Sequence, residues 1–321
     1  MLLLTFLFSI ICFTLYRWYK ENKRHENISD KYVYITGCDT GFGNLLAKSL
    51  DKQGVHVLAA CFTDKGQDDL KKNASPKLKT FHLDVTKSES VRKAAEFIKS
   101  EVGEKGLWGL VNNAGITMPL GFSDWLSTED YKSILEVNLI GVIDVTLSVL
   151  QLIKKSQGRI VNMSSICGRL CISSGGYCIS KFGVEAFTDM LRTDMRYFGV
   201  NIACIEPGFF KTLMTSEAEI LKSYSQVWDR APAEVKDDYG HDFCEKLCAS
   251  VKGRIDSVLD SDLTKVTWCM EHALFAVYPR TRYSAGWDAK ILWLPLSYMP
   301  TTISDYVLSK MRKLVPAKSV I

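Results

Sequence analysis

The residues with the clearest chemical potential are Tyr177 and Lys181, which are separated by three positions. On a helix, side chains four residues apart project from the same face and would lie together. A lysine ammonium beside a phenol favours the phenolate and lowers the tyrosine pKa from about 10 toward the range of a general acid and base. The same spacing is also common in surface pairs, so the residues around it must decide.

Other polar residues follow apolar runs that read as strands. Ser164 and Ser165 end the run 159–165, Asn112 lies in the run 107–115, and Asn138 lies in a later helical stretch. The carboxyl ends of parallel strands meet at one edge of a sheet, where doubly wound folds bind their ligands. These residues would therefore gather with Tyr177 around a cofactor.

A glycine-rich turn joins the first strand, 31–37, to a helix predicted over 44–54. Glycines at 37, 41 and 43 allow a tight turn and a close approach to a pyrophosphate, while the helix N-terminus offers free N–H groups. Glycines also serve tight turns for steric reasons alone. Their position between the first strand and the first helix favours dinucleotide binding.

Short β-branched runs alternate with amphipathic helical stretches from residue 31 onward. Continuous apolar strands separated by helices are typical of a parallel sheet covered on both faces. The fold class is therefore α/β, a single Rossmann-type doubly wound parallel sheet behind an N-terminal membrane anchor. Strands are predicted at 31–37, 55–62, 78–85, 107–115, 159–165 and 201–208, and a further helix at 90–102.

The predicted domain covers 29–280 and contains a polar, helical insertion at 210–265. The insertion follows the carboxyl end of the sixth strand, where a substrate would bind. Its apolar residues Phe209, Phe210, Leu213, Met214 and Trp228 are equally consistent with a substrate pocket or an ordinary core. An apolar tail, 281–321, is interrupted by prolines and is expected to pack on the domain or to rest on a membrane.

Residues 1–19 are predicted to form an uncleaved membrane signal-anchor, followed by a basic linker at 20–28. The first sixteen residues carry no charge, and the basic residues come after them rather than before, unlike a signal peptide. A helix of this length spans about 24–28 Å, which suits the thin endoplasmic reticulum membrane. The following basic cluster favours a cytosolic domain. The alternative is a helix that lies in one leaflet.

Composition excludes several other classes. The 321 residues are 47% hydrophobic, and their net charge of +4 is too small to suggest nucleic acid. The ten cysteines contain no C-x-x-C motif, so we expect neither a metal site nor a structural disulfide. Scattered thiols in a chain of this size suggest a reducing compartment. The closest pairs, Cys167/Cys171 and Cys244/Cys248, are interpreted as buried filler on helices.

Taken together, the motifs resemble those of the short-chain dehydrogenase/reductase family along the whole chain after the anchor. The segments ITGCDTGFG, GGYCISKFGVEAF, CIEPGFFKT and YPRTRYSAGWDAK are similar to the microsomal retinol/hydroxysteroid dehydrogenase branch. The resemblance implies a catalytic tetrad of Asn138, Ser165, Tyr177 and Lys181. Tyr177 would exchange the hydroxyl proton, and the serine would position the substrate oxygen.

Two family spacings disagree about the serine. The distance to Tyr177 selects Ser164, whereas the distance to Gly168 selects Ser165, which we prefer because that glycine is fixed to the strand end. Ser164, Ser165 and Phe209 are the predicted substrate contacts. The predicted cofactor contacts are Gly37, Asp39, Thr40, Gly41, Phe42, Gly43, Phe62, Asp64, Asp84, Val85, Asn112, Ala114, Gly115, Tyr177, Lys181, Pro207, Gly208 and Thr212.

The expected cofactor is NAD rather than NADP. NADP-using relatives tend to carry an arginine about where Phe62 stands, and Asp64 follows nearby, although Lys65 is also close. The expected activity is oxidation of a lipophilic alcohol, a retinoid or a hydroxysteroid, at the endoplasmic reticulum membrane. The alternatives are an NADPH-dependent carbonyl reductase and a non-catalytic dinucleotide-binding protein. We expect no nucleic-acid partner, and a homo-oligomer is left open.

Overall fold

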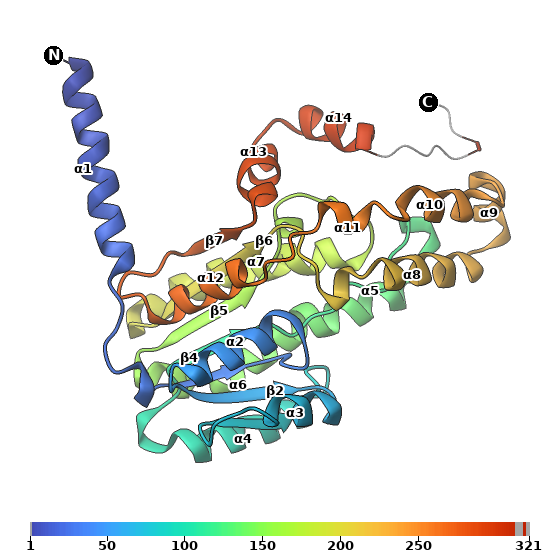
Figure 1. Cartoon of the computed structure of the whole chain (residues 1–321). Helices are drawn as coiled ribbons and strands as arrows, with labels where there is room; N and C mark the ends of the chain where they lie inside the picture. Colours follow the sequence, from blue (N-terminus) through green and yellow to red (C-terminus); the bar gives the residue numbers. More distant parts are fainter. Residues whose placement is uncertain (1, 312–316, 319–321) are drawn as a thin grey trace.

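The computed structural model describes residues 2–311, 317 and 318; the remaining residues of the predicted anchor and tail lie outside it. Seven parallel strands form one sheet in the order β3-β2-β1-β4-β5-β6-β7 (Figure 1). The order reverses between β1 and β4, which confirms the doubly wound α/β fold. The strands are β1 (Tyr32–Ile35), β2 (His56–Cys61), β3 (Leu78–His82), β4 (Gly109–Asn112), β5 (Arg159–Met163), β6 (Asn201–Pro207) and β7 (Arg282–Ala285).

Helices cover both faces of the sheet. On one face, α2 (Gly41–Lys52) and α12 (Thr264–Phe275) pack on the strands, with α3 (Asp64–Lys71) near the edge. On the other lie α4 (Ser88–Val102), α6 (Gly141–Ser156) and α7 (Gly176–Met195). Each helix buries an apolar stripe at helical spacing, such as Val91, Ala94, Ile98 and Val102 of α4.

The first six strands lie where the sequence predicts them, but the seventh was missed. β7 is four residues long, and two of them, Arg282 and Ser284, are polar. Such an edge strand lacks the continuous apolar run that identified the others. Because β7 pairs with β6, the predicted domain end at 280 is too early.

Within the described part of the chain, one stretch, Thr128–Ser156, is long and apolar enough to cross a membrane. It comprises α5 (Thr128–Leu135), a π-helical turn η4 (Glu136–Ile140) and α6. The apolar residues of α6 that face the sheet are buried in its core. Its hydrophobicity is therefore that of a core helix.

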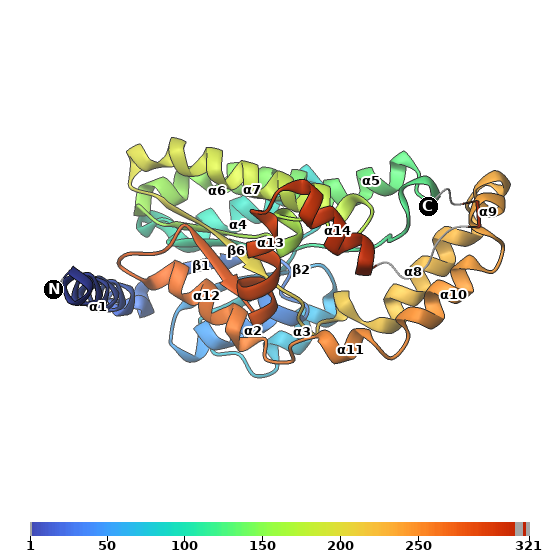
Figure 2. The same cartoon turned by 90° about the horizontal axis from the view of Figure 1, so that it is seen from above.

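The predicted insertion forms a helical lobe beyond the carboxyl ends of the strands, at the far end of the molecule from α1 (Figure 2). Its centre is aromatic, with the rings of Trp125 and Trp228 4.6 Å apart. Trp228 is thus part of the core of the lobe. The lobe helices are α8 (Glu217–Asp229), α9 (Ala233–Tyr239), α10 (Phe243–Val251) and α11 (Ile255–Val258).

The tail continues from β7 through η8 (Ala289–Trp293), α13 (Leu294–Ser297) and α14 (Thr301–Met311). Its inner side packs on the domain, since Trp293 and Leu296 are buried against Ile166 and Cys178. Its outer side is apolar as well, with Ile291 73% and Tyr298 74% exposed. Core packing therefore accounts for one side of the tail only.

The N-terminal helix α1 (Leu2–Asn22) stands away from the domain (Figure 1). Its C-terminal end is joined to the domain, because Glu21 forms an ion pair with Arg280 and the His25 amide donates to the Phe275 carbonyl over 2.8 Å. Short helical turns complete the described chain: η1 (Ile28–Asp30), η2 (Gly103–Lys105), η3 (Ser123–Trp125), η5 (Ile166–Gly168), η6 (Arg196–Phe198) and η7 (Leu213–Thr215).

Candidate active site

A cavity of about 460 Å³ lies at the carboxyl ends of the strands, where the strand order reverses. This is the place where doubly wound sheets bind ligands. Most of the predicted site residues line it. They are Gly37, Asp39, Thr40, Gly41, Phe42, Phe62, Asp84, Val85, Ala114, Gly115, Ser164, Ser165, Tyr177, Lys181, Pro207, Gly208 and Thr212.

Five predicted residues do not line the cavity. Asn112 points into the sheet and donates hydrogen bonds to Thr146 and Asn162, both over 2.8 Å. Phe209 packs on Trp293 of the tail, with ring centroids 5.9 Å apart. The other three are Gly43, Asp64 and Asn138.

The glycine-rich turn is shaped by its backbone. Gly37 and Gly41 have φ angles of 69° and 62°, which favour glycine. A Cβ on Gly43 would lie 2.5 Å from the Gly37 carbonyl oxygen, so Gly43 serves close packing rather than ligand contact. The glycine-rich turn and the N-terminus of α2 together fit a dinucleotide pyrophosphate.

Asn113, which the sequence analysis passed over, supports this turn. Its side-chain amide donates to the carbonyls of Thr36 and Gly37, both over 2.9 Å. Asn113 follows β4 directly and lines the cavity, whereas its neighbour Asn112 faces the sheet interior. The double asparagine motif was the available signal, but it does not show which member faces the ligand.

The acidic group at the end of β2 is Asp39 rather than Asp64. The Asp39 carboxylate accepts hydrogen bonds from the backbone amides of Phe62 and Thr63, both over 2.9 Å. Asp64 begins α3 outside the cavity. Asp39 therefore ties the glycine turn to the strand end where the adenosine ribose of a dinucleotide would lie.

Ser165, rather than Ser164, is the serine beside Tyr177. The Ser165 hydroxyl lies close enough to the Tyr177 phenol to lower its pKa, and it accepts from the Cys167 amide over 3.2 Å. The Ser164 hydroxyl instead donates to the backbone carbonyl of Lys181 over 3.4 Å. It also lies where a side chain at Gly168 would fall.

Tyr177 and Lys181 both face the cavity from the first turns of α7. The Lys181 ammonium lies 5.6 Å from the Tyr177 ring centre and donates to the Met163 carbonyl over 2.8 Å. Burial lowers the pKa of Lys181 to about 8. Burial also raises the pKa of Tyr177, so the expectation that Lys181 lowers it is wrong for this structure.

Asn138 lies behind the cavity in the π-helical turn η4, a type of irregularity that often occurs at functional sites. Its side chain accepts from the Ile116 amide and donates to the Ile116 carbonyl, both over 2.8 Å. It also donates to the Ser180 hydroxyl over 3.0 Å. Asn138 thus joins the segment after β4 to the helix that carries Tyr177 and Lys181.

This arrangement suits proton exchange with an alcohol. A substrate oxygen bound between Ser165 and Tyr177 would meet two hydroxyl groups, and the phenol can give or take a proton. The glycine turn, on another side of the same cavity, would hold a dinucleotide.

The sequence pattern of the short chain dehydrogenase family matches residues 31–221, more than half of the chain. The chain belongs to the short-chain dehydrogenase family. It is an oxidoreductase that acts on a CH–OH group with NAD or NADP as the acceptor.

Relatives with named activities cover nearly the whole of this short-chain dehydrogenase. Retinol dehydrogenase 16 of Homo sapiens is 54% identical over 294 residues, 92% of either chain. The 17-beta-hydroxysteroid dehydrogenase type 6 of Homo sapiens is 52% identical, over 92% of this chain and 93% of the relative. Retinol dehydrogenase 7 of Rattus norvegicus is 51% identical over 92% of each.

Solved structures show the same fold at lower identity. A short-chain dehydrogenase from Streptomyces avermitilis is 22% identical, with a TM-score of 0.64, over 88% of this chain and 95% of that one. A short chain dehydrogenase from Burkholderia cenocepacia, in complex with NADP, is 19% identical, with a TM-score of 0.62, over 87% and 97%.

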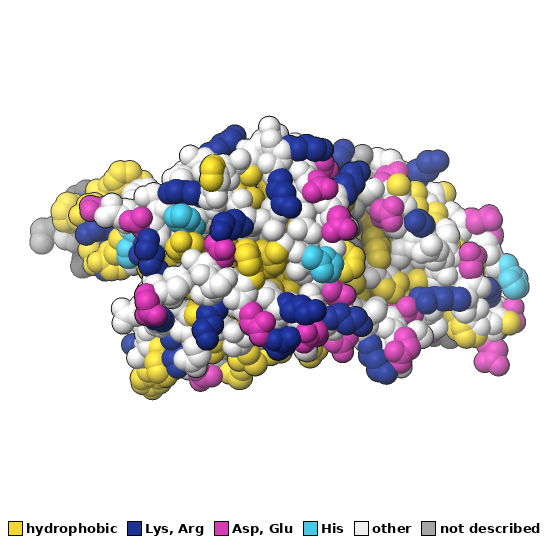
Figure 3. All heavy atoms as spheres, turned by 90° about the horizontal axis from the view of Figure 1, so that it is seen from below, with side chains coloured by type: hydrophobic (Ala, Val, Ile, Leu, Met, Phe, Trp, Pro, Cys, Tyr) yellow, Lys and Arg dark blue, Asp and Glu magenta, His cyan; other side chains and the backbone are white. Residues whose placement is uncertain are grey.

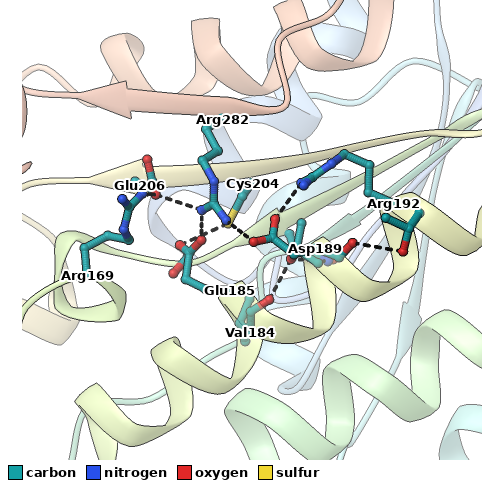
Figure 4. A network of polar contacts seen from close by, with 12 residues as sticks. Arg169, Val184, Glu185, Asp189, Arg192, Cys204, Glu206 and Arg282 are labelled. Carbon is teal, nitrogen blue, oxygen red and sulfur yellow. Dashed lines mark hydrogen bonds and ion pairs between the residues drawn. The ribbon is translucent and has the colours of Figure 1, made fainter.

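A polar network lies between α7 of this short-chain dehydrogenase and the strands β6 and β7 (Figure 4). Arg282 of β7 pairs with Glu185 and Asp189 of α7 and, over 3.0 Å, with Glu206 of β6. Arg169, from the loop after η5, also pairs with Glu206, over 2.8 Å. The network connects the helix that carries Tyr177 to β6 and β7, the last two strands at one edge of the sheet.

The remaining wall of the cavity is largely apolar. Leu213 and Met214 come from η7, and Phe210 lies just after β6. These three were among the apolar residues predicted for a pocket or a core, whereas Ile116 and Val137 also line the cavity and lie in no family motif. These apolar residues line the same cavity as Tyr177.

Proposed function

We propose that this enzyme oxidises lipophilic alcohols with NAD, converting all-trans-retinol to retinal and 3α- or 17β-hydroxysteroids to ketones. The observation that carries this proposal is that the apolar residues Ile116, Leu213 and Met214 line the same cavity as Ser165 and Tyr177. The names of the relatives support the same two substrate classes. Within that branch, the motifs around Gly37, Tyr177 and Trp287 also resemble dehydrogenase/reductase SDR family member 9.

We assign the proton transfer to Tyr177, whose phenolate form takes the substrate hydroxyl proton and becomes the phenol. When bound, a nicotinamide cofactor would be held by the glycine turn and Lys181 and would supply the hydride acceptor for the substrate carbon. Ser165 donates a hydrogen bond that positions the substrate oxygen beside Tyr177. Lys181, with a pKa of about 8, carries charge at neutral pH close to the phenol and the cofactor ribose. Asn138 holds Ile116 and Ser180 and would bind a water that connects Lys181 to solvent.

The preference for NAD is part of the proposal. Among the residues that the structure describes, Lys181 is the one lysine or arginine that lines the cavity. A 2′-phosphate would add about two negative charges beside Phe62 and the Asp39 carboxylate, where Lys65 in the first turn of α3 is a nearby cation but does not line the cavity. A free 2′-hydroxyl carries no such penalty.

We further propose that α1 anchors the enzyme in the endoplasmic reticulum membrane with the catalytic domain in the cytosol. The tail helices α13 and α14 lie on the side of the sheet toward which α1 projects (Figure 1). In this tail Ile291 of η8, Tyr298 just after α13 and Tyr306 of α14 are exposed and apolar or aromatic. The opposite face carries interspersed charges of both signs (Figure 3). This distribution supports a bilayer next to the tail.

The activity and the topology are tested on microsomes that contain the full-length chain. Retinol and 3α- and 17β-hydroxysteroids are assayed with NAD and with NADP, and we expect the higher kcat/KM with NAD. Higher values with NADP would favour a carbonyl reductase, and no turnover with any alcohol would favour a non-catalytic role. Protease added to sealed microsomes should digest the catalytic domain, and full protection would place it in the lumen.

A further inference from the structure

The backbone that leaves β6 at the cavity is held by an acidic residue that the reaction described above does not use. Asp288 lies between β7 and η8, in the GWDAK part of a motif quoted from the sequence. The residue is buried, with 7% of its surface exposed. Its carboxylate accepts a hydrogen bond from the Phe209 amide over 2.9 Å. Asp288 thus connects the beginning of the tail to the segment that follows β6.

Two glycines make room for this carboxylate. A Cβ on Gly208 would overlap both of its oxygens, so the Asp288 side chain occupies the space that a side chain at position 208 would need. Gly286 has a φ angle of 94°, which favours glycine and lets the chain turn from β7 back toward β6. The Gly208 amide also donates to the carbonyl of Ala285, the last residue of β7, over 2.8 Å.

The segment after β6 is held from its other side by backbone alone. The Asp260 amide donates to the Phe209 carbonyl over 3.0 Å, and the Lys211 amide donates to the Asp260 carbonyl over 2.9 Å. These bonds do not depend on the Asp288 side chain. Loss of the Asp288 carboxylate should therefore loosen one side of the segment and leave the rest of the fold in place.

The segment held in this way forms part of the cavity. Pro207, Gly208 and Phe210 line it together with Tyr177. In the sheet β6 lies beside β5, which leads directly to Ser165. A dinucleotide that extends from the glycine turn after β1 to the substrate oxygen at Ser165 and Tyr177 would therefore end beside the segment that leaves β6.

We propose that Asp288 is a positioning residue for the nicotinamide end of the dinucleotide. Through the Phe209 amide and the close contact with Gly208, its carboxylate fixes the backbone against which that end of the cofactor lies. Without the carboxylate, part of the binding free energy would be spent on ordering this segment. The inference rests on the dinucleotide-dependent reaction proposed above, and it is independent of which alcohol is oxidised.

The dissociation constants of NADH and NADPH are measured by fluorescence titration of the full-length enzyme and its variants. Asp288→Ala should raise the constant of the more tightly bound dinucleotide about tenfold, because the Phe209 amide loses its charged acceptor. Asp288→Asn keeps an oxygen for that amide and should stay within about threefold of the unsubstituted enzyme. The control Asp305→Ala removes an exposed carboxylate from α14 of the same tail and should change neither constant.

A second substitution tests the close contact itself. In Gly208→Ala the added methyl group would displace the carboxylate, so dinucleotide binding should weaken at least as much as in Asp288→Ala. In the double variant the methyl group would take the space that the carboxylate leaves. Its dissociation constant should therefore be no higher than that of Asp288→Ala alone.

Three results would overturn the proposal: an unchanged dissociation constant in Asp288→Ala, an Asp288→Asn enzyme that binds as weakly as Asp288→Ala, or losses that multiply in the double variant. Urea denaturation of each variant separates binding from folding, because a merely structural role would lower the midpoint and leave the dissociation constant of the folded protein unchanged. Since the titration needs no turnover, an enzyme that oxidises none of the alcohols would refute the proposed substrates separately.

Discussion

The two walls of the cavity are built differently. On the catalytic wall, Ser165, Lys181 and the supporting Asn138 each have hydrogen-bond partners at or near the ends of strands or on helices. On the substrate wall, η7 places Leu213 in the cavity with 67% of its surface exposed. The comparison indicates that hydrogen-bonded side chains hold the chemistry, whereas selectivity lies in apolar side chains of η7, a turn that is held by Thr117 and Thr215.

Replacing Tyr177 by phenylalanine tests the catalytic wall most severely. Phenylalanine keeps the ring but removes the proton donor, so kcat/KM should fall by about 10²–10⁴ while NAD still binds. Steady-state turnover and titration of cofactor binding on the same variant measure both quantities. A variant that retains more than about a tenth of its activity would show that another group transfers the proton.

The two adjacent serines provide a matched pair on the same wall. Ser165→Ala should lower kcat/KM by about 10², because its hydroxyl contacts Tyr177, whereas Ser164→Ala should change it by less than about fivefold. Both variants are assayed side by side with one alcohol. The reverse ranking would mean that the loop before Tyr177 rearranges when substrate binds.

Three adjacent pairs show how far the sequence specifies this site. The sequence patterns pointed to Asn112 but not to the adjacent Asn113, and to both serines 164 and 165 and both phenylalanines 209 and 210. Each pair directly follows or ends a strand, where successive side chains point in opposite directions. Only the folded backbone selects the member that faces the cavity. The structure selects Asn113 and Phe210 over their neighbours, and it places Ser165 against Tyr177.

Local sequence patterns predicted the fold better than they predicted the pKa values of the site. Six strands and the glycine turn were predicted from apolar runs and residue spacings that each span only a few positions of the sequence. β7 was missed because it has four residues, two of them polar, and so lacks the apolar run that identifies a strand. The pKa of Tyr177 was misjudged because the i, i+4 spacing shows its cation but does not show its burial.

Substitution in the polar network between α7 and the strands β6 and β7 tests whether the rigidity of the catalytic wall depends on buried charges. Arg282→Met leaves the Glu185 and Glu206 carboxylates with fewer partners. We expect a loss of about 2 kcal/mol in the free energy of unfolding, less than for a fully buried pair because Arg169 still pairs with Glu206. Urea denaturation measures it, and the control Lys79→Met at an exposed pair should cost less than about 1 kcal/mol. Equal losses of unfolding free energy in the two variants would show that the buried network stabilises the protein no more than the exposed ion pair does.

Cofactor choice is expected to respond to one exposed side chain at the end of β2. Phe62 is 61% exposed and lines the cavity beside Asp39. Phe62→Arg should shift the ratio of kcat/KM for NAD over NADP toward NADP by roughly tenfold, since hydrogen bonds to a charged group contribute about 1.5 kcal/mol or more. Phe62→Leu, the control, should leave the ratio unchanged. An unchanged ratio in the arginine variant would place the 2′-position elsewhere.

The smallest effect is expected on the substrate wall. Leu213→Ala removes apolar surface from the cavity without touching the reacting atoms, so it should weaken the ground state and the transition state equally. KM for a lipophilic alcohol should rise by about threefold with kcat unchanged, which is the signature of uniform binding. Leu147→Ala, which alters an exposed leucine on α6, is the control and should change neither parameter. A fall in kcat at constant KM would show that Leu213 positions the reacting carbon, and the two walls would then share one task.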